Sequence, residues 1–278
     1  MIEVDRLNFS YGRRKVLKDL SFKVDAGEVL SILGPNGVGK TTLMKCMCNI
    51  HKPQSGRVTI DGVDVLSITG KDLAKKIAFV PQSVPRSKTL VYDSVLMGRK
   101  PYINIGVSEK DLDITSRAIR DLDLEDLAFR YSDRISGGEF QKVQIARALA
   151  QESSVMMLDE PTNNMDMNNQ HLTMKLVSQI VRGTNKCAIM TMHDINLSIY
   201  CSDKLIFMKD GDIAAYGGRD IVTPELIKDV YGMDVDVISH NNNPFIVPKE
   251  TVPGLAANRH GESHPHPHDV ADHIFDTD

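Results

Sequence analysis

A short apolar run that leads into a glycine-rich loop restricts the fold of this chain more than any other feature. Val29–Leu33 precede the loop, and the helix-forming residues Leu43–Ile50 follow it. The loop reads Gly34-Pro35-Asn36-Gly37-Val38-Gly39-Lys40-Thr41-Thr42. It matches the pattern G-x-x-x-x-G-K-S/T in the strand, loop and helix context that the pattern requires. The sequence therefore predicts a phosphate-binding loop between a strand and a helix.

The residue types of this loop suit a nucleoside triphosphate with its Mg²⁺ ion. Gly37 and Gly39 let the backbone fold around phosphate oxygens, and the helix N-terminus offers unpaired N–H groups. Lys40 adds a positive charge near the β- and γ-phosphates, and the Thr41 hydroxyl is placed to bind Mg²⁺. We expect the whole loop, from Gly34 to Thr42, to bind ATP.

Short apolar runs alternate with longer amphipathic stretches up to about residue 240, a pattern typical of an α/β protein with a mainly parallel sheet. Between about residues 84 and 150 the periodicity is helical, notably at Glu109–Leu122 and Gly137–Ala150. We interpret this stretch as a helical subdomain inserted into one domain of residues 1–248. The predicted sheet strands are Val29–Leu33, Ile77–Pro81, Val155–Leu158, Cys187–Met192 and Lys204–Met208.

Composition excludes several classes of function. The longest apolar runs, such as Ile189–Met192, are far shorter than the ~20 residues of a membrane-spanning helix. Residues 1–11 lack the pattern of a secretory signal, so a cytoplasmic location is expected. The net charge of −4 is concentrated in residues 250–278, and the nearly neutral remainder does not indicate a nucleic-acid partner. The four cysteines lack the paired Cys-x-x-Cys spacing of a zinc site or redox centre, so they are expected to be small core residues. They are Cys46, Cys48, Cys187 and Cys201.

Two adjacent acids, Asp159 and Glu160, follow the apolar run Val155–Leu158. Successive strand residues point to opposite sides of a sheet, so the two carboxylates are expected to have different tasks. Asp159 is placed to help hold Mg²⁺ through water, and Glu160 to orient and polarise an attacking water. The alternative, a solvated strand end, is disfavoured in a chain that also carries a phosphate loop.

The stretch Ile135-Ser136-Gly137-Gly138-Glu139-Phe140-Gln141 resembles the signature motif of ATP-binding cassette (ABC) ATPases, usually written with Leu first. The resemblance implies a P-loop fold with a mainly parallel sheet, an antiparallel β part and an inserted helical subdomain. It also implies that Ser136, Gly137, Gly138 and Glu139 bind the ATP held by a second copy of the chain. A homodimer with ATP between its subunits is therefore expected.

Further elements of the ABC pattern occur in the expected order. Gln82 matches the glutamine that reaches Mg²⁺ and the attacking water, and Asp166 matches the aspartate of the D-loop. His193 matches the histidine that contacts the γ-phosphate. Tyr11 lies 29 residues before Lys40 and matches the aromatic residue that stacks on adenine. The resemblance thus assigns Glu160, His193 and Gln82 to catalysis.

The signature departs from the usual pattern at two positions. Ile135 replaces Leu, which conserves volume and is expected to have little effect. Phe140 replaces the Arg or Gln more often found after Ser-Gly-Gly-Glu, and it is expected to alter packing at the dimer interface. Neither departure removes a phosphate ligand.

Three stretches, Val95–Pro101, Ala146–Glu152 and Glu225–Gly232, resemble the ATPases of importers for iron(III)-siderophores, haem and cobalamin. This resemblance implies separate membrane permease subunits, an external substrate-binding protein and a peripheral position on the cytoplasmic side of the membrane. A soluble ABC ATPase in iron–sulfur assembly is the main alternative. DNA-repair members need a long coiled coil, for which the 95 residues between Lys40 and Ser136 leave no room.

The composition changes after about Asn241, and residues 249–278 form an acidic, histidine-rich tail that is expected to be disordered. Imidazoles suit Zn²⁺ or Ni²⁺, so metal binding is one interpretation of the tail. A flexible polar extension without a specific role is the favoured alternative. The tail contains His260, His264, His266, His268, His273, Asp269 and Asp272.

Overall fold

The computed structural model describes residues 1–240 and 243–249, and within them the strands form a six-stranded sheet, a four-stranded sheet and a hairpin. The six-stranded sheet has the order β10-β9-β3-β8-β7-β6, in which all neighbours are parallel except β10 and β9. Its strands are β3 (Val29–Leu33), β6 (Ile77–Val80), β7 (Val155–Asp159), β8 (Cys187–Thr191), β9 (Lys204–Lys209) and β10 (Asp212–Gly217).

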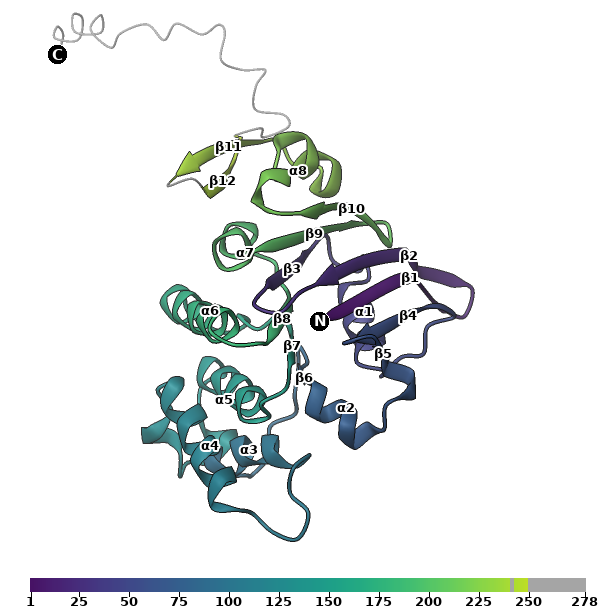
Figure 1. Cartoon of the computed structure of the whole chain (residues 1–278). Coiled ribbons are helices and arrows are strands. Elements are labelled where there is room, and N and C mark those ends of the chain that lie inside the picture. The colour runs from purple at the N-terminus through teal and green to yellow at the C-terminus, as the bar shows by residue number, and fades with distance from the viewer. Residues whose placement is uncertain (241–242, 250–278) are drawn as a thin grey trace, which may run out of the picture.

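The central strands β3, β7 and β8 are buried along their whole length, because helices cover one face and the second sheet with its helix covers the other (Figure 1). Such strands read as continuous apolar runs, which is why the sequence reveals them. Pairing of Asp159 with Thr191 brings the carboxyl ends of β7 and β8 to one edge of the sheet. Polar groups that follow these strands therefore meet there.

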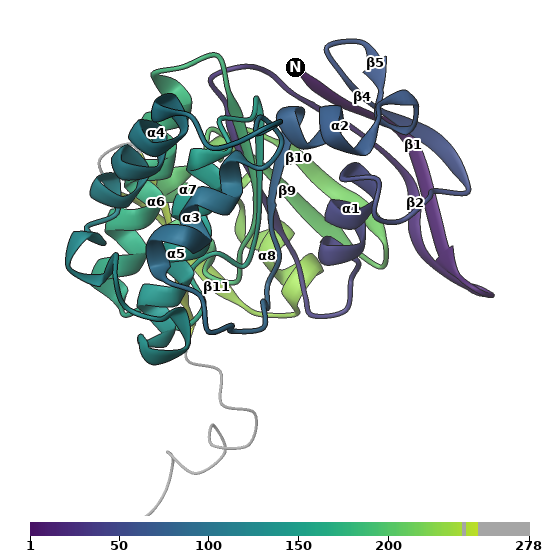
Figure 2. The same cartoon turned by 90° about the horizontal axis from the view of Figure 1, so that it is seen from below.

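The second sheet is antiparallel, in the order β2-β1-β4-β5. It packs with α1 (Lys40–Met47) on the face of the large sheet opposite α5 (Gly137–Ala150) and α6 (Met167–Arg182) (Figure 2). The core between them includes Leu17, Leu43 and Met157. The strands are β1 (Ile2–Tyr11), β2 (Arg14–Val24), β4 (Ser55–Ile60) and β5 (Val63–Asp64).

The helical segment lies between β6 and β7, as the periodicity predicts. Both of its longer helices begin with a capping box, in which a serine and an acidic residue three positions later satisfy each other's backbone N–H groups. The segment consists of α3 (Val91–Leu96), η2 (Met97–Arg99), α4 (Glu109–Asp121), η3 (Glu125–Leu127), η4 (Ser132–Arg134) and α5 (Gly137–Ala150).

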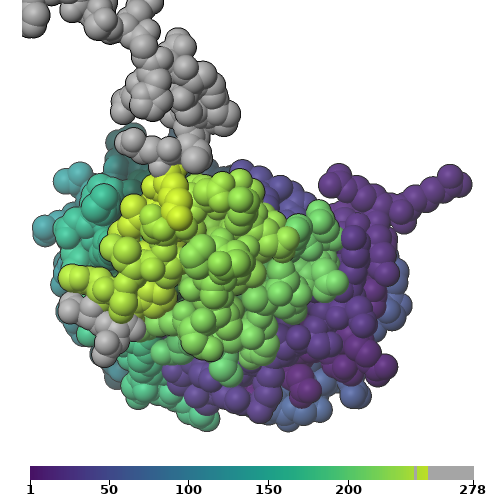
Figure 3. All heavy atoms as spheres, turned by 90° about the horizontal axis from the view of Figure 1, so that it is seen from above, coloured from purple at the N-terminus to yellow at the C-terminus, as the bar shows by residue number. Residues whose placement is uncertain are grey.

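The C-terminal elements cover one end of the large sheet and form most of the face in Figure 3. The tail of residues 250–278 lies outside the described residues. None of the helices in the described ranges has the length and apolar content needed to cross a lipid bilayer. The remaining elements are η1 (Val65–Ser67), α2 (Gly70–Lys76), α6 (Met167–Arg182), α7 (Ile195–Cys201), η5 (Arg219–Ile221), α8 (Pro224–Tyr231), β11 (Val235–His240) and β12 (Asn243–Pro248).

The predicted fold class, a mainly parallel sheet with an antiparallel part and inserted helices, is confirmed. Some boundaries were wrong: β6 ends at Val80 instead of Pro81, whose nitrogen has no hydrogen to donate to a ladder. The helix after the glycine-rich loop covers Lys40–Met47 instead of Leu43–Ile50. All four cysteines are free thiols; Cys48 is half-buried and the others are buried, close to the prediction of small core residues.

Candidate functional site

The glycine-rich loop joins β3 to α1, and its backbone requires glycine. Gly34, Gly37 and Gly39 all have positive φ angles, of 146°, 78° and 116°. A Cβ atom on Gly34 would lie 2.5 Å from the carbonyl oxygen of Met208, closer than packed atoms approach. The loop therefore curls tightly over the end of the sheet, with the N-terminus of α1 directed at the space that it surrounds.

Lys40, the first residue of α1, is buried with 6% of its surface exposed. Its Nζ donates hydrogen bonds to the carbonyl oxygens of Gly34 at 2.6 Å and Pro35 at 3.1 Å. Burial lowers the pKa of the Lys40 ammonium, and the carboxylates of Glu160 and Asp159 oppose that shift. The loop thus holds the Lys40 ammonium inside its own curve, near the carboxylates of Asp159, which ends β7, and Glu160, which follows it.

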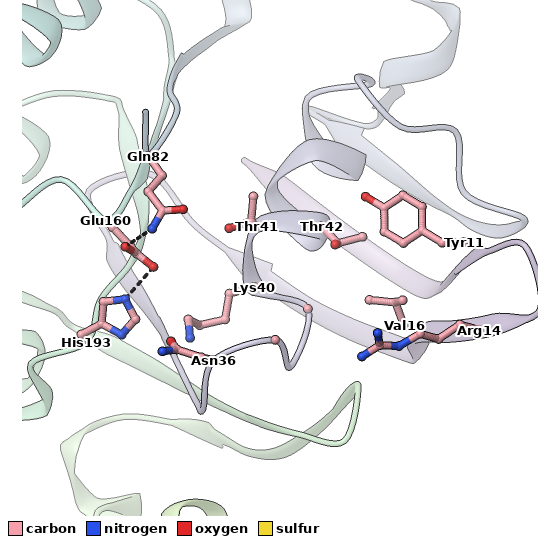
Figure 4. Close-up of a pocket in the computed structure, with 12 residues that line it drawn as sticks. Tyr11, Arg14, Val16, Asn36, Lys40, Thr41, Thr42, Gln82, Glu160 and His193 are labelled. Carbon is pink, nitrogen blue, oxygen red and sulfur yellow. Dashed lines mark hydrogen bonds and ion pairs between the residues drawn. The ribbon is translucent and has the colours of Figure 1, made fainter. Parts of the chain in front are cut away.

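Glu160 lies at the centre of a cluster of polar side chains. His193 Nε2 is 2.6 Å from Glu160 Oε1, and Gln82 Nε2 donates to Oε2 at 2.5 Å (Figure 4). Asn163 Nδ2 donates to the same Oε2 at 2.7 Å. The backbone N–H of Glu160 donates to Thr191 Oγ1 at 2.9 Å. The structure therefore brings the three predicted catalytic residues, Gln82, Glu160 and His193, into direct contact.

Asp159, the last residue of β7, has hydrogen-bond partners different from those of the Glu160 carboxylate. Its Oδ1 accepts hydrogen bonds from Thr191 Oγ1 at 2.6 Å and Thr41 Oγ1 at 3.2 Å. Its Oδ2 is buried and has no hydrogen-bond partner among the residues that the structure describes. A buried carboxylate oxygen without a partner is costly, and together with the Thr41 hydroxyl and the Gln82 amide oxygen it gives the oxygen donors that Mg²⁺ prefers.

Tyr11 and the catalytic cluster lie on opposite sides of the same pocket (Figure 4), with Lys40 and Thr41 between them. Half of the Tyr11 surface, 50%, is exposed, so part of the side chain is accessible to a ligand. Its hydroxyl is 2.9 Å from His51 Nε2, and its ring packs edge-on against Phe9 at 4.9 Å. The pocket is lined by Tyr11, Arg14, Val16, Asn36, Gly37, Gly39, Lys40, Thr41, Thr42, Gln82, Glu160 and His193.

Among the described residues, the signature and the D-loop aspartate lie outside the lining of this pocket. Ser136 caps α5, where its Oγ accepts from the Glu139 N–H. Asp166 caps α6 in the same way. The two segments contact each other, since a Cβ on Gly138 would lie 3.0 Å from the carbonyl oxygen of Asn164. Gly137 and Gly138 therefore lie against the D-loop segment at Asn164, and they do not line the pocket formed by the glycine-rich loop of their own chain.

Phe140, which is expected from the sequence to alter packing at a dimer interface, packs within its own chain. Phe140 is 9% exposed and belongs to the hydrophobic core around α5. The guanidinium of Arg86 lies 5.2 Å above its ring and donates to the Ile135 carbonyl oxygen. The side chain turns inward from the first turn of α5, so Phe140 fills this chain's own interior.

Sequence reasoning missed four residues of the site. Thr191 could have been found because it ends a buried strand beside Asp159. Asn163 lies three residues after Glu160, but an amide at that spacing is not a signal in itself. Arg14 and Val16 line the pocket from β2, which antiparallel pairing brings beside Tyr11. The predicted residues Pro35 and Val38 line a neighbouring pocket on the other side of the loop.

Comparison with known proteins agrees with this geometry. Residues 17–163 match the family model described as ABC transporter. An uncharacterized ABC transporter ATP-binding protein of Methanocaldococcus jannaschii is 46% identical over 89% of this chain and 98% of its own length. The petrobactin import ATP-binding protein of Bacillus subtilis is 33% identical over 87% of this chain and 97% of its own.

A solved structure gives the same result at the level of the fold. It belongs to a metal-chelate type ABC transporter in an inward-facing conformation and is similar with a TM-score of 0.77 and 28% sequence identity. The match covers 89% of this chain and 97% of that one. The predicted family is thereby confirmed: the chain belongs to the ABC transporter family, as one of its ATP-binding, ATP-hydrolysing members.

Proposed function

We propose that this chain is the ATP-hydrolysing subunit of an importer for an iron chelate, haem or cobalamin. Residues 1–248 form its ATPase domain, and it works as a homodimer bound to separate permease subunits on the cytoplasmic side of the membrane. An external substrate-binding protein delivers the cargo. The names of the petrobactin-import relative and of the metal-chelate transporter support this cargo class.

The observation that carries the proposal is the arrangement of Glu160, His193 and Gln82 opposite the phosphate loop (Figure 4). Glu160 accepts a proton from the attacking water, and Gln82 and His193 hold its carboxylate in place for that transfer. Preorganised donors of this kind contribute to catalysis because they need not reorganise during the reaction.

The loop and Tyr11 bind the nucleotide. Tyr11 stacks on adenine, and the residues from Gly34 to Thr42 surround the phosphates, with the Lys40 ammonium turning from loop carbonyls to phosphate oxygens. Thr41, Gln82 and Asp159 hold Mg²⁺, which neutralises charge on the phosphates when it is bound. The buried Oδ2 of Asp159 supports this assignment, because that oxygen otherwise lacks a partner in the described part of the chain.

A second copy of the chain completes each site. Ser136, Gly137, Gly138 and Glu139 lie at the N-terminus of α5, a suitable place for an anion. They do not line the pocket of their own chain within the described residues, so a partner chain is the place where they can meet a γ-phosphate. ATP then joins the two subunits, hydrolysis releases them, and the helical segment passes this motion to the permease.

Replacement of Glu160 by Gln tests the mechanism. The amide keeps the shape of the side chain but cannot accept the proton from water, so MgATP is expected to accumulate bound and to hold the dimer closed. Size-exclusion chromatography with light scattering should give a monomer without nucleotide and a dimer with MgATP. A variant that binds ATP and stays monomeric contradicts the sandwich mechanism for the isolated chain.

A separate experiment tests the transport assignment. The chain is expressed with a tag beside candidate permease genes, and membranes are solubilised in mild detergent. The permease is expected to co-purify with the tagged chain, and reconstituted vesicles should take up a ferric siderophore, haem or cobalamin only with MgATP. Recovery of the chain with iron–sulfur assembly proteins instead would favour the alternative of a soluble ABC ATPase.

A further inference from the structure

One oxygen of the Glu160 carboxylate has two hydrogen-bond donors of different origin. Gln82 donates from the segment that follows β6, 78 residues earlier in the chain. Asn163 donates from three residues further along the same turn, at 2.7 Å. Oε1 is left to His193. The hydrogen bond from Asn163 to Glu160 is explained neither by the phosphate loop nor by the signature.

The backbone places Asn163 over the carboxylate. Glu160 has a positive φ of 52°, which reverses the chain directly after β7. The N–H of Asn163 then donates to the carbonyl oxygen of Glu160 at 3.3 Å and closes a four-residue turn. Asn163 and Glu160 therefore move as one unit, because both belong to this turn.

Gln82 contacts the turn through its side chain, and no backbone hydrogen bond among the described residues ties it to the turn. It lies on the connection from the six-stranded sheet into the helical segment, which passes the motion of the dimer to the permease in the function proposed above. We therefore expect a donor on that connection to shift with the helical segment. Asn163 is instead held to Glu160 by the hydrogen bond that closes the turn.

We propose that Asn163 is a positioning residue, which holds the Glu160 carboxylate toward the attacking water independently of the helical segment. The inference rests on the proposed function of Glu160 as the group that accepts the proton. A carboxylate that is held at one oxygen presents the other in a fixed direction, and hydrogen bonds to a charged group are the stronger ones. Without Asn163, Oε2 loses its remaining donor whenever Gln82 leaves, and the carboxylate is held only through Oε1 by His193.

Two substitutions separate this role from a merely structural one. Asn163→Ala removes the side chain but keeps the backbone bond that closes the turn. Asn163→Asp keeps size and shape but replaces the donor by a second carboxylate oxygen, which repels Glu160. Asn168→Ala is the matched control, because Asn168 lies on the exposed surface at the start of α6.

The measurement is steady-state hydrolysis of MgATP by the full chain, with melting temperatures to verify folding. We expect kcat to fall about tenfold in Asn163→Ala and about 100-fold in Asn163→Asp, with KM within about twofold of wild type. Asn168→Ala should match wild type. A purely structural role would lower the melting temperature together with kcat, and that result would overturn the proposal, as would an effect on KM alone.

A double mutant distinguishes the failure of this inference from that of the proposed function. In single-turnover hydrolysis of labelled ATP, Asn163→Ala combined with Glu160→Gln should be no slower than Glu160→Gln alone, because Asn163 acts through Glu160. A further loss of about tenfold would place its action elsewhere. If Glu160→Gln is inactive and both Asn163 variants keep wild-type kcat, only the inference fails. If Glu160→Gln keeps wild-type activity, the proposed role of Glu160 fails and the inference with it.

Discussion

His193 Nε2 lies 2.6 Å from Glu160 Oε1, and the two side chains differ sharply in exposure, at 45% and 9% of their surface. Each residue follows a central strand, Glu160 after β7 and His193 shortly after β8, and these strands are parallel neighbours. Sheet topology thus fixes the pair. The exposed histidine lines the pocket and contacts the buried carboxylate, and in the proposed function it also contacts an incoming phosphate.

This relationship predicts that His193→Ala lowers kcat for ATP hydrolysis by about 100-fold, since the change removes a donor that orients Glu160. ATP affinity should stay within about threefold, because the loop and Tyr11 supply most of the binding. Phosphate release and equilibrium binding of labelled ATP measure the two quantities. His171→Ala, an exposed histidine on α6, serves as the control. Equal losses in both variants would contradict a specific role.

Most of the site residues could be predicted because each follows a local rule. The loop from Gly34 to Thr42 is contiguous, and Asp159 and Glu160 come at the end of a buried strand whose apolar run is visible in the sequence. Because β7 and β8 are parallel, their carboxyl ends lie at one edge of the sheet. A contiguous motif and the direction of a buried strand can both be recognised in the sequence.

What could not be predicted depends on contacts between distant segments. The attachment of Lys40 to the carbonyl oxygens of its own loop needs the curvature that the positive φ angles create. The burial of Phe140 depends on which side of α5 faces the core, and its neighbour Arg86 lies far away in sequence. The contact between Asn163 and Glu160 depends on a turn whose φ angle of 52° no residue type demands.

Tyr11 gives a prediction on nucleotide binding. Stacking of one base on an aromatic ring is worth about 1–3 kcal/mol, so Tyr11→Ala should weaken ATP binding about tenfold and leave kcat at saturation within about twofold. The chain has no tryptophan, so Tyr11→Trp creates its only indole fluorophore, and its emission should change on addition of MgATP. Tyr200→Trp, outside the pocket lining, should show no change. Unaltered indole emission from the Tyr11→Trp variant at saturating MgATP would refute base stacking.

Gly98 gives a prediction on stability. A Cβ atom there would lie 2.2 Å from the carbonyl oxygen of Arg147, on the backbone of α5. Gly98→Ala should therefore push η2 away from α5 and lower the free energy of unfolding by about 2 kcal/mol. Gly70→Ala is the matched control, because its Cβ would meet nothing within 4 Å in the described part of the chain. Urea denaturation should show that Gly70→Ala is neutral or stabilising by up to about 1 kcal/mol; equal effects would refute the argument from contact.

Asp111 and Arg99 form a buried pair that ties α4 to η2. Arg99 is 3% exposed and donates from Nε to Asp111 Oδ1 at 2.9 Å. Hydrogen bonds from the Ser108 side chain, followed by the one from Arg99, lower the pKa of Asp111 from its ordinary 3.8 to about 2. The folded chain therefore holds the ionised form more strongly than the unfolded chain does, so the stabilisation is present above about pH 4 and is lost as the pH falls to about 2.

Asp111→Asn removes the charge beside Arg99 Nε and leaves Arg99 with Glu152, 3.0 Å from Nη1, as its charged partner. The substitution should lower the free energy of unfolding by about 2 kcal/mol at pH 7. The difference between wild type and variant should persist to about pH 4 and shrink below it, because wild-type Asp111 is then protonated on unfolding. Asp113→Asn is the control: Asp113 pairs with Arg117 on the exposed face of α4, so its effect should stay below about 0.5 kcal/mol. Urea titrations between pH 7 and pH 3 measure all three proteins. A difference that stays constant over that range would mean that packing of the amide, and not the charge of Asp111, determines the stability of the α4 attachment.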